Sequence, residues 1–275
     1  MKTFSLHLAF VILTLQLTVA RGADPAAEEL LGRMLDAQNT RGAIIRAKLV
    51  VTDTATNEHR TVQLRMKVRR DDDCTRLLYL VLWPRPYRGQ ALYFERTRDG
   101  TVTGFLFEPP DQVTPLTPAL LSRSFLDSDL SIEDLAEDFW RWPSPAISGE
   151  ETVKGDPCKI IDLHPPPGLK TSCSLVRAWI SARKAVPLRL EKFGSDGSLS
   201  KRFVVEKVVR QDKVWAPVTT TIQVPNRTRE TTLEISNGDR DIEIPLEEFS
   251  LEAIRKSAQS LNQEPPTSGK SRESK

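Results

Sequence analysis

Over most of the chain, apolar and polar residues alternate with a period of two, which is typical of antiparallel strands that bury one face. In residues 62–69 the even positions are apolar and the odd positions are polar or charged. Turn dipeptides such as Asp99-Gly100 and Asp196-Gly197 separate the alternating segments. The spacing predicts roughly eleven strands in meander order between residues 42 and 238, and it leaves open whether they form a sandwich or a barrel.

The alternation stops between Phe105 and Leu135. Prolines at positions 109, 110, 115 and 118 cannot donate hydrogen bonds to a neighbouring strand, which excludes a central strand there. Residues 131–142 then favour a helix, because Ser131 can cap it, acidic residues follow in the first turn, and apolar residues recur at helical spacing. We predict a loop-and-helix insert that lies across the mouth or face of the sheet, where a ligand would compete with it.

Both ends of the chain differ from this central part. Residues 1–22 contain a short positive region, an apolar run and then small residues, which predicts a cleaved secretory signal peptide and an exported protein. No cysteine lies near the cleavage region, so no lipobox is expected. Residues 24–38 predict a helix capped by Asp24. We expect one domain over residues 24–256 and, because residues 257–275 are rich in Ser, Lys, Gln and Pro, a disordered tail.

Composition argues against several classes of function. Basic residues number 39 and acidic residues 37, so no charge excess drives binding to nucleic acid. The three cysteines, Cys74, Cys158 and Cys173, lack the spacing of a metal site, and the sequence leaves open whether any disulfide forms. The histidines have no Ser or Cys nucleophile motif beside them. We therefore expect neither an enzyme nor a bound cofactor.

One acidic cluster allows two interpretations. Asp127, Asp129, Glu133 and Asp134 lie at the start of the predicted insert helix. Carboxylates at this position either cap the helix and complement its dipole, or converge on a metal ion. We favour the first interpretation and predict no metal. The run 71–73, three consecutive aspartates, similarly predicts a solvated turn rather than a cation site.

Five separated stretches carry a further signal. They read RGQALYF, FLFEPP, SFLDSDLSIEDL, GEETVKGDPCKII and VRAWISARKAVPLRLEKFGSDGSL. Their order and spacing resemble the outer membrane lipoprotein-sorting proteins of bacteria, the LolA-like superfamily, over residues 25–251. Phe105 and Phe107 stand where that family usually has Trp and Tyr, whereas the insert departs from the family pattern at Asp127 and Ile132.

The resemblance implies a mainly β (α+β) fold: a curved, half-open antiparallel barrel with an N-terminal helix and a helical lid. It also implies a periplasmic carrier that binds the acyl chains of lipoproteins or free lipid, with an inner-membrane transporter or an outer-membrane acceptor as partner. The alternative is a lipid-sensing or accessory module that acts beside a membrane transporter or signalling protein. We expect the apolar cavity and the lid to be lined by Leu92, Phe94, Phe105, Phe107, Phe125, Leu126 and Trp179.

Overall fold

The computed structural model describes residues 24–136, 138–211 and 214–263. In these residues thirteen strands form one antiparallel sheet in the order β6-β5-β4-β3-β2-β1-β13-β12-β11-β10-β9-β8-β7. The strands are β1 (Gly42–Asp53), β2 (His59–Arg70), β3 (Cys74–Trp83), β4 (Ala91–Thr97), β5 (Val102–Glu108), β6 (Gln112–Pro115), β7 (Ala146–Val153), β8 (Asp156–Leu163), β9 (Leu175–Ser181), β10 (Val186–Phe193), β11 (Leu199–Gln211), β12 (Val214–Gln223) and β13 (Arg229–Arg240). The helices are α1 (Pro25–Gln38), α2 (Pro118–Leu121), α3 (Ile132–Ala136) and α4 (Leu251–Gln263), and the 3-10 turns are η1 (Arg85–Tyr87), η2 (Phe125–Asp127), η3 (Phe139–Arg141) and η4 (Leu246–Phe249).

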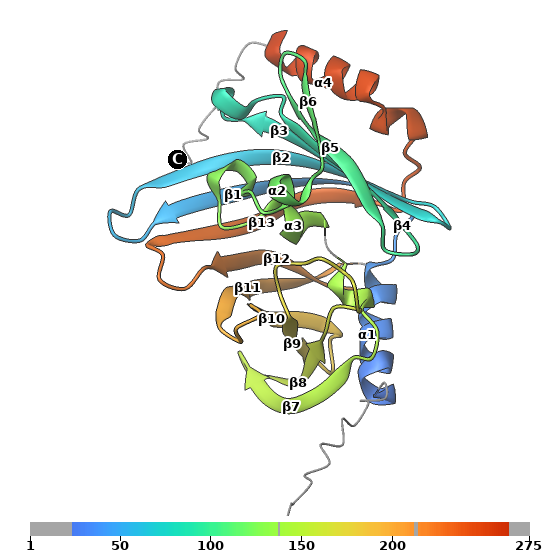
Figure 1. Ribbon diagram of the computed structural model, residues 1–275, viewed down its shortest axis with the longest axis vertical. Helices are drawn as coiled ribbons and strands as arrows, with labels where there is room; N and C mark the ends of the chain where they lie inside the picture. The colour runs from blue at the N-terminus through green and yellow to red at the C-terminus, as the bar shows by residue number, and fades with distance from the viewer. Residues whose placement is uncertain (1–23, 137, 212–213, 264–275) are drawn as a thin grey trace, which may run out of the picture.

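The sheet is curved and open. Its end strands β6 and β7 do not pair with each other in the described part of the chain, so the barrel does not close. Register shifts between β1 and β13, β9 and β10, and β11 and β12 mark bulges, which bend strands and increase their twist. Figure 1 shows the sheet bent around α2 and α3, with α1 beside the β7–β9 end and α4 at the β3–β6 end. The predicted mainly β, half-open architecture is confirmed.

The sequence did not reveal β6, which is only four residues long and lies in the proline-rich segment. It pairs with β5 through contacts such as Phe105 opposite Pro115, at the outer edge of the sheet. An edge position suits a strand that contains proline, because one side needs no hydrogen-bonding partner. The exclusion of a central strand therefore agrees with the structure, while the predicted number of strands was slightly too low.

The concave face of the sheet carries two apolar clusters. The first joins β1–β5 and β12 to the insert between β6 and β7. The second joins β8–β10 to α1, whose Leu30, Leu31 and Met34 are all at most 5% exposed. The predicted first helix is confirmed, including its cap: the Asp24 carboxylate accepts a hydrogen bond from the Ala26 amide at 3.0 Å.

The opposite, convex face is covered at one end by α4. Ile254 and Ala258 of this helix are 1% and 2% exposed and pack on Leu78 and Leu80 of β3. The predicted disorder from Ser257 onward is therefore wrong for residues 257–263, which continue α4. A polar composition hid an apolar stripe at helical spacing. Residues 1–23 and 264–275, which include the predicted signal peptide and the rest of the predicted tail, lie outside the described residues.

Two further expectations need correction. The expected end of the strands at residue 238 is too early, because β13 continues to Arg240, with Asn237 and Gly238 opposite Arg46 and Ile45 at a bulge. Glycine fits there because a side chain at position 238 would approach the Ile44 carbonyl oxygen to 3.1 Å. The predicted helix over residues 131–142 is divided into α3 and η3. The three cysteines are free thiols, so the structure contains no disulfide among them.

Candidate ligand-binding site

Residues 116–136 and 138–143, here called the lid, lie across the concave face (Figure 1). The lid contains α2, η2, α3 and η3. Its inward side chains pack in one cluster with β1–β5, and each is at most 8% exposed: Leu120, Phe125, Leu126, Leu130, Ile132 and Ala136. The lid thus covers the surface that an apolar ligand would need.

A cavity of about 200 Å³ remains between the lid and strands β3–β5. Leu92 and Leu106 line it from the sheet, and Phe125 and Leu126 line it from the lid. Ligand pockets commonly measure about 300–1,000 Å³. The cavity is therefore smaller than most ligand pockets, and a long acyl chain would require the lid to move.

Four of the seven predicted site residues come together here. Leu92 and Phe94 of β4 are fully buried at 0% exposed, and they lie in the same cluster as Phe125 and Leu126 of the lid. Tyr79 completes this aromatic group, since its ring lies 6.1 Å from that of Phe94 and 6.2 Å from that of Phe125. These four side chains lie between the sheet and the lid, and their role in binding a ligand stays a prediction.

Phe105 and Phe107 do not belong to this group. Both lie on the convex face, in the cluster beneath α4, and Phe107 is 1% exposed. The residue of β5 that faces the lid is Leu106, which pairs with Leu92 of β4. Adjacent residues of a strand point to opposite faces of the sheet. The prediction correctly placed Phe105 and Phe107 on one face, but it chose the concave face instead of the convex one. The placement of Phe105 and Phe107 in the cavity was therefore wrong.

Trp179 also lies on the convex face, in a cluster with Cys158 and Leu188. The Arg189 guanidinium lies 3.6 Å from the centre of its indole ring, and the indole N–H donates to Glu151 at 2.7 Å. These contacts give Trp179 a structural role far from the lid. The prediction that Trp179 lines the cavity was therefore wrong, because its side chain points to the convex face of the sheet.

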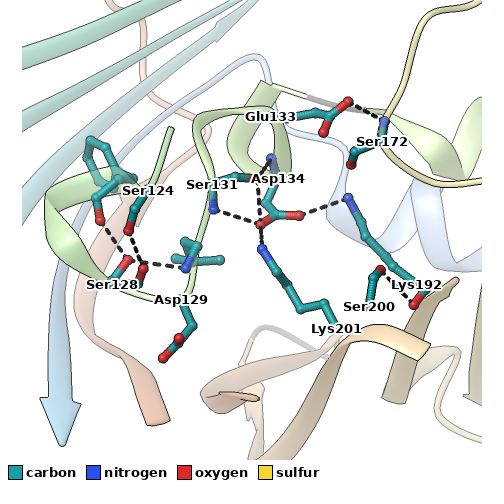
Figure 2. A network of polar contacts seen from close by, with 12 residues as sticks. Ser124, Ser128, Asp129, Ser131, Glu133, Asp134, Ser172, Lys192, Ser200 and Lys201 are labelled. Atoms are coloured by element: carbon teal, nitrogen blue, oxygen red, sulfur yellow. Dashed lines mark hydrogen bonds and ion pairs between the residues drawn. The ribbon is translucent and has the colours of Figure 1, made fainter. Parts of the chain in front are cut away.

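The lid is held to the sheet by polar contacts, drawn in Figure 2. Asp134 of α3 forms ion pairs with Lys192, at 2.9 Å, and with Lys201. Its carboxylate also accepts from the Ser131 amide at 2.8 Å, while the Asp134 amide donates to the Ser131 hydroxyl at 3.2 Å. These reciprocal bonds are the capping arrangement expected for Ser131. One carboxylate therefore serves both the start of the lid helix and its attachment to the sheet.

The two lysines need this carboxylate. Lys192 of β10 and Lys201 of β11 lie directly opposite each other, and like charges in such a pair destabilise a sheet. Their side chains are 3% and 13% exposed, and that of Asp134 is 5% exposed. Burial raises the pKa of Asp134, but the two lysines outweigh burial and lower the pKa to about 2. Asp134 is therefore ionised at neutral pH.

A second attachment lies at Asp129, whose side chain is 0% exposed. The Thr231 hydroxyl donates to its carboxylate at 2.8 Å and accepts from its amide at 2.9 Å. The Arg229 guanidinium donates to the same carboxylate at 3.2 Å. Because Thr231 and Arg229 both belong to β13, this group joins the lid to the middle of the sheet.

A third attachment lies at the η2 turn. The Arg60 guanidinium of β2 donates to the Leu126 carbonyl at 2.8 Å, and the Tyr87 hydroxyl donates to the Asp127 carboxylate at 2.7 Å. Both Leu126 and Asp127 have positive φ angles, of 53° and 51°. Non-glycine residues adopt this conformation only when their surroundings hold it. The contacts from Arg60 and Tyr87 provide that support.

The acidic cluster of the lid is thus explained by capping and by ion pairs. Among the described residues, no group of three or more His, Cys, Asp or Glu side chains is arranged to hold a metal ion. Sequence reasoning missed the partners Lys192, Lys201 and Thr231, which are 58 to 102 residues away from the acids they contact. One signal was present: Lys192 lies on the same side of β10 as Leu190 and so interrupts an apolar stripe.

Comparison with known proteins agrees with this architecture. A family model described as "Uncharacterized protein" matches residues 74–256. The structure resembles a DUF1329 family protein from Desulfovibrio piger, with a TM-score of 0.77 and 20% identity over 83% of this chain and 98% of the other. A domain described as outer membrane lipoprotein-sorting, from Vibrio parahaemolyticus, gives a TM-score of 0.75 at 17% identity, over 82% and 97%. A LolA superfamily protein from Nitrosomonas europaea gives 0.67 at 14%, over 82% and 98%.

The chain belongs to the family whose model matches residues 74–256, and it has the fold of the LolA superfamily. Its curved sheet and helical insert correspond to the architecture that the resemblance implied. No curated protein matches its sequence. None of its described helices combines the length and the apolar composition needed to span a membrane.

Proposed function

We propose that this protein is a non-enzymatic carrier of the bacterial periplasm that binds the acyl chains of a lipoprotein or lipid between its concave face and its lid. One observation carries the proposal. The lid buries an apolar sheet surface with its own apolar side chains, yet ion pairs and hydrogen bonds attach it to the sheet. Such a surface is dry and ordered without cargo. The lipoprotein-sorting description of the Vibrio parahaemolyticus domain supports the same function.

The energies favour an exchange between lid and cargo. Each buried methylene contributes about 0.8 kcal/mol, so a sixteen-carbon chain gains about 12 kcal/mol before the costs of ordering it. An acyl chain that displaces the lid also exposes side chains such as Phe125 and Leu130, which are about 5% exposed in the closed lid. The apolar surface that the lid exposes therefore offsets part of the gain from the acyl chain. A carrier needs such an offset, because it must release what it binds.

The test uses protein purified from a bacterial periplasm, analysed by native mass spectrometry and lipid extraction, and then titrated with a triacylated lipopeptide. The informative variant is Leu126→Asp. Leu126 lines the cavity at a φ of 53°, a conformation that Asp tolerates, so the substitution places a charge in the cavity wall without a backbone conflict. The matched control is Leu246→Asp, because Leu246 is 47% exposed on η4.

We expect acyl species to accompany the wild type and the Leu246→Asp variant, and to be absent from the folded Leu126→Asp variant. Circular dichroism establishes that each variant is folded. A folded wild-type protein that arrives empty and does not bind the lipopeptide would refute the carrier function. A protein partner that binds the empty, intact cavity would then favour the accessory module.

A further inference from the structure

A second concave feature lies at the other end of the lid. It is a cleft of about 970 Å³, lined by the ends of β2–β5, by residues 138–143 and by the loop that contains Leu169. Val102 and Trp142 line it and also belong to the apolar clusters beneath the lid and α1. The cleft is therefore continuous with the apolar concave face. A molecule with an apolar chain and a polar end could lie across both.

Arginine side chains end the apolar face at this cleft. Arg70 follows Val68 on the concave side of β2, and Arg96 follows Phe94 on the concave side of β4. Arg141 reaches the cleft from η3 of the lid. We call Arg70, Arg96 and Arg141, together with the cleft they line, the arginine cleft. Along this one face of the sheet, uncharged apolar side chains are followed directly by positively charged guanidinium groups.

Two of these arginines pair with the same carboxylate. Asp138 lies among them, 3.2 Å from the Arg96 guanidinium and 3.1 Å from that of Arg141. Burial and the neighbouring charges of Arg141, Arg96 and Arg240 lower the pKa of Arg70, while Asp138 opposes them. Arg96 and Arg141 thus share the Asp138 carboxylate, and Arg70 lies close enough for their charges to act on it.

The other acids of the cleft are engaged elsewhere or exposed. Asp71 pairs with Arg69 and Arg76, at 2.8 and 2.6 Å, and neither arginine lines the cleft. Asp99 accepts from the Thr101 amide at 3.1 Å and from the Thr97 hydroxyl, within the turn between β4 and β5. Asp72 and Asp73 are exposed at the outer turn. The acids therefore lie at the rim, and the arginines line the wall nearest the lid.

We propose that the arginine cleft binds a phosphate-bearing anionic group, the headgroup of the same lipid whose acyl chain lies beneath the lid. The proposal rests on the carrier function proposed above and adds its ligand class, an anionic phospholipid or a phosphate ester of similar charge. Guanidinium groups suit this role because their planar N–H forks donate two hydrogen bonds to one phosphate. The acyl chain then extends from the cleft past Val102 onto the concave face.

The test compares two probes with the same acyl chain. 1-Oleoyl lysophosphatidic acid carries a phosphate, 1-monoolein does not, and glycerol 3-phosphate provides the phosphate without the chain. Binding of each to the full chain is measured by calorimetry below the concentration at which the lipids form micelles. The variants are Arg141→Gln, which removes the charge, and Arg141→Lys, which keeps the charge and removes the fork. Arg141 is 64% exposed, so neither change disturbs the core.

Arg183→Gln is the matched control. Its side chain is 71% exposed and pairs with a single aspartate at 2.8 Å, as Arg141 does at 3.1 Å, and it does not line the cleft. We expect the wild type to bind the phosphate-bearing lipid at least tenfold more tightly than monoolein. Arg141→Gln should reduce that preference by about tenfold, the value of one charge-assisted hydrogen bond, and should leave monoolein binding unchanged. Arg141→Lys should give an intermediate loss, and Arg183→Gln none.

Equal affinity for the two lipids, or a preference that Arg141→Gln does not change, would overturn the headgroup proposal while monoolein binding left the carrier function intact. Binding of neither lipid would refute the carrier function and the lipid headgroup together. In that case, glycerol 3-phosphate binding that depends on Arg141 would identify a site for a soluble phosphate ester and overturn the lipid source. Tighter binding of the phosphate-bearing lipid than of either fragment would support one ligand that spans both regions.

Discussion

Replacing Asp134 by asparagine tests whether ion pairs keep the lid closed. The amide has the shape of the carboxylate and can still accept the hydrogen bond from the Ser131 amide, so the helix keeps much of its cap. What it loses is the negative charge between Lys192 and Lys201. Two buried ammonium groups then face each other across adjacent strands without the Asp134 carboxylate between them.

The magnitude follows from the pKa. Folding lowers the pKa of Asp134 from 3.8 to about 2, and each unit corresponds to about 1.4 kcal/mol, so the ionised carboxylate stabilises the closed lid by about 2 kcal/mol. Removing one partner of a buried ion pair generally costs about 3–5 kcal/mol, because the remaining charge stays buried. We expect Asp134→Asn to lower the free energy of lid opening by at least about 2 kcal/mol. Amide exchange in the lid should then accelerate at least about thirtyfold.

Hydrogen exchange followed by mass spectrometry measures this for peptides covering residues 118–136, with the peptides of β1 as the internal reference. Glu133→Gln is the matched control, since Glu133 is the adjacent acid in α3 and, within the described part of the chain, accepts one hydrogen bond, from the Ser172 amide at 2.9 Å. A Lys201→Gln background should reduce the effect of Asp134→Asn, because one of the two lysines that pair with Asp134 is gone. Exchange in the lid that is equal for Asp134→Asn and Glu133→Gln would refute the ion-pair explanation.

The same pKa fixes the direction of the pH dependence. A carboxyl group whose pKa is lowered by folding contributes stability above its unfolded pKa, and that contribution is lost as the pH falls through the folded value. For Asp134 the contribution is complete above about pH 4 and disappears toward about pH 2. Lid exchange in the wild type, corrected for the intrinsic pH dependence, should therefore approach that of Asp134→Asn in this range. The difference between the two proteins should not change between pH 5 and 7.

Three other substitutions or deletions have defined outcomes. Phe107 is 1% exposed beneath α4, so Phe107→Ala should lower the free energy of unfolding in urea by about 3–5 kcal/mol and leave lipid binding intact. A selective loss of lipid binding would instead show that Phe107 lines the cavity. Thr231→Val removes the hydroxyl that bonds the Asp129 carboxylate and amide at 2.8 and 2.9 Å, so lid opening should become easier by about 1–3 kcal/mol, and unchanged lid exchange would contradict this. Deleting residues 251–275 uncovers the surface on which Ile254 and Ala258 pack, so the melting temperature should fall and binding of an apolar dye should rise. An unchanged melting curve would show that α4 adds no stability.

The sequence predicted the sheet well because its signal is local. A period of two over residues 62–69 determines that one side is buried and the other is not, whatever the rest of the chain does. It does not determine which side curves inward when both sides of a strand are apolar. In β5, either Phe105 and Phe107 or the intervening Leu106 could face inward. Helix α4 covers the two phenylalanines, so Leu106 faces inward. The position of α4 comes from residues more than 140 positions later, so the strand alone could not reveal it.

The site was less predictable for the same physical reason. The acids of the lid were evident in the sequence, and the start of α3 was correctly assigned to Ser131. Their partners were not evident, because Thr231 is 102 residues from Asp129 and Lys201 is 67 residues from Asp134. Sheet topology brings them together, and a single sequence does not encode topology in any one segment. A lysine on an apolar stripe, as at position 192, is the kind of local inconsistency that marks such a contact.

The opposed lysines also set a threshold for opening the lid. If the lid is displaced by an acyl chain, Lys192 and Lys201 lose the Asp134 carboxylate, and the cost of about 2 kcal/mol must be recovered from the ligand. Roughly three buried methylenes recover that amount, and the rest of the acyl chain must offset the apolar lid side chains that become exposed. A short apolar molecule that only fills the cavity of about 200 Å³ leaves the lid in place, whereas a long chain can displace it. When the chain leaves, the same ion pair favours closure over an empty apolar surface. The attachment of the lid is therefore strong enough to stay closed over a small apolar solute and weak enough for one acyl chain to overcome.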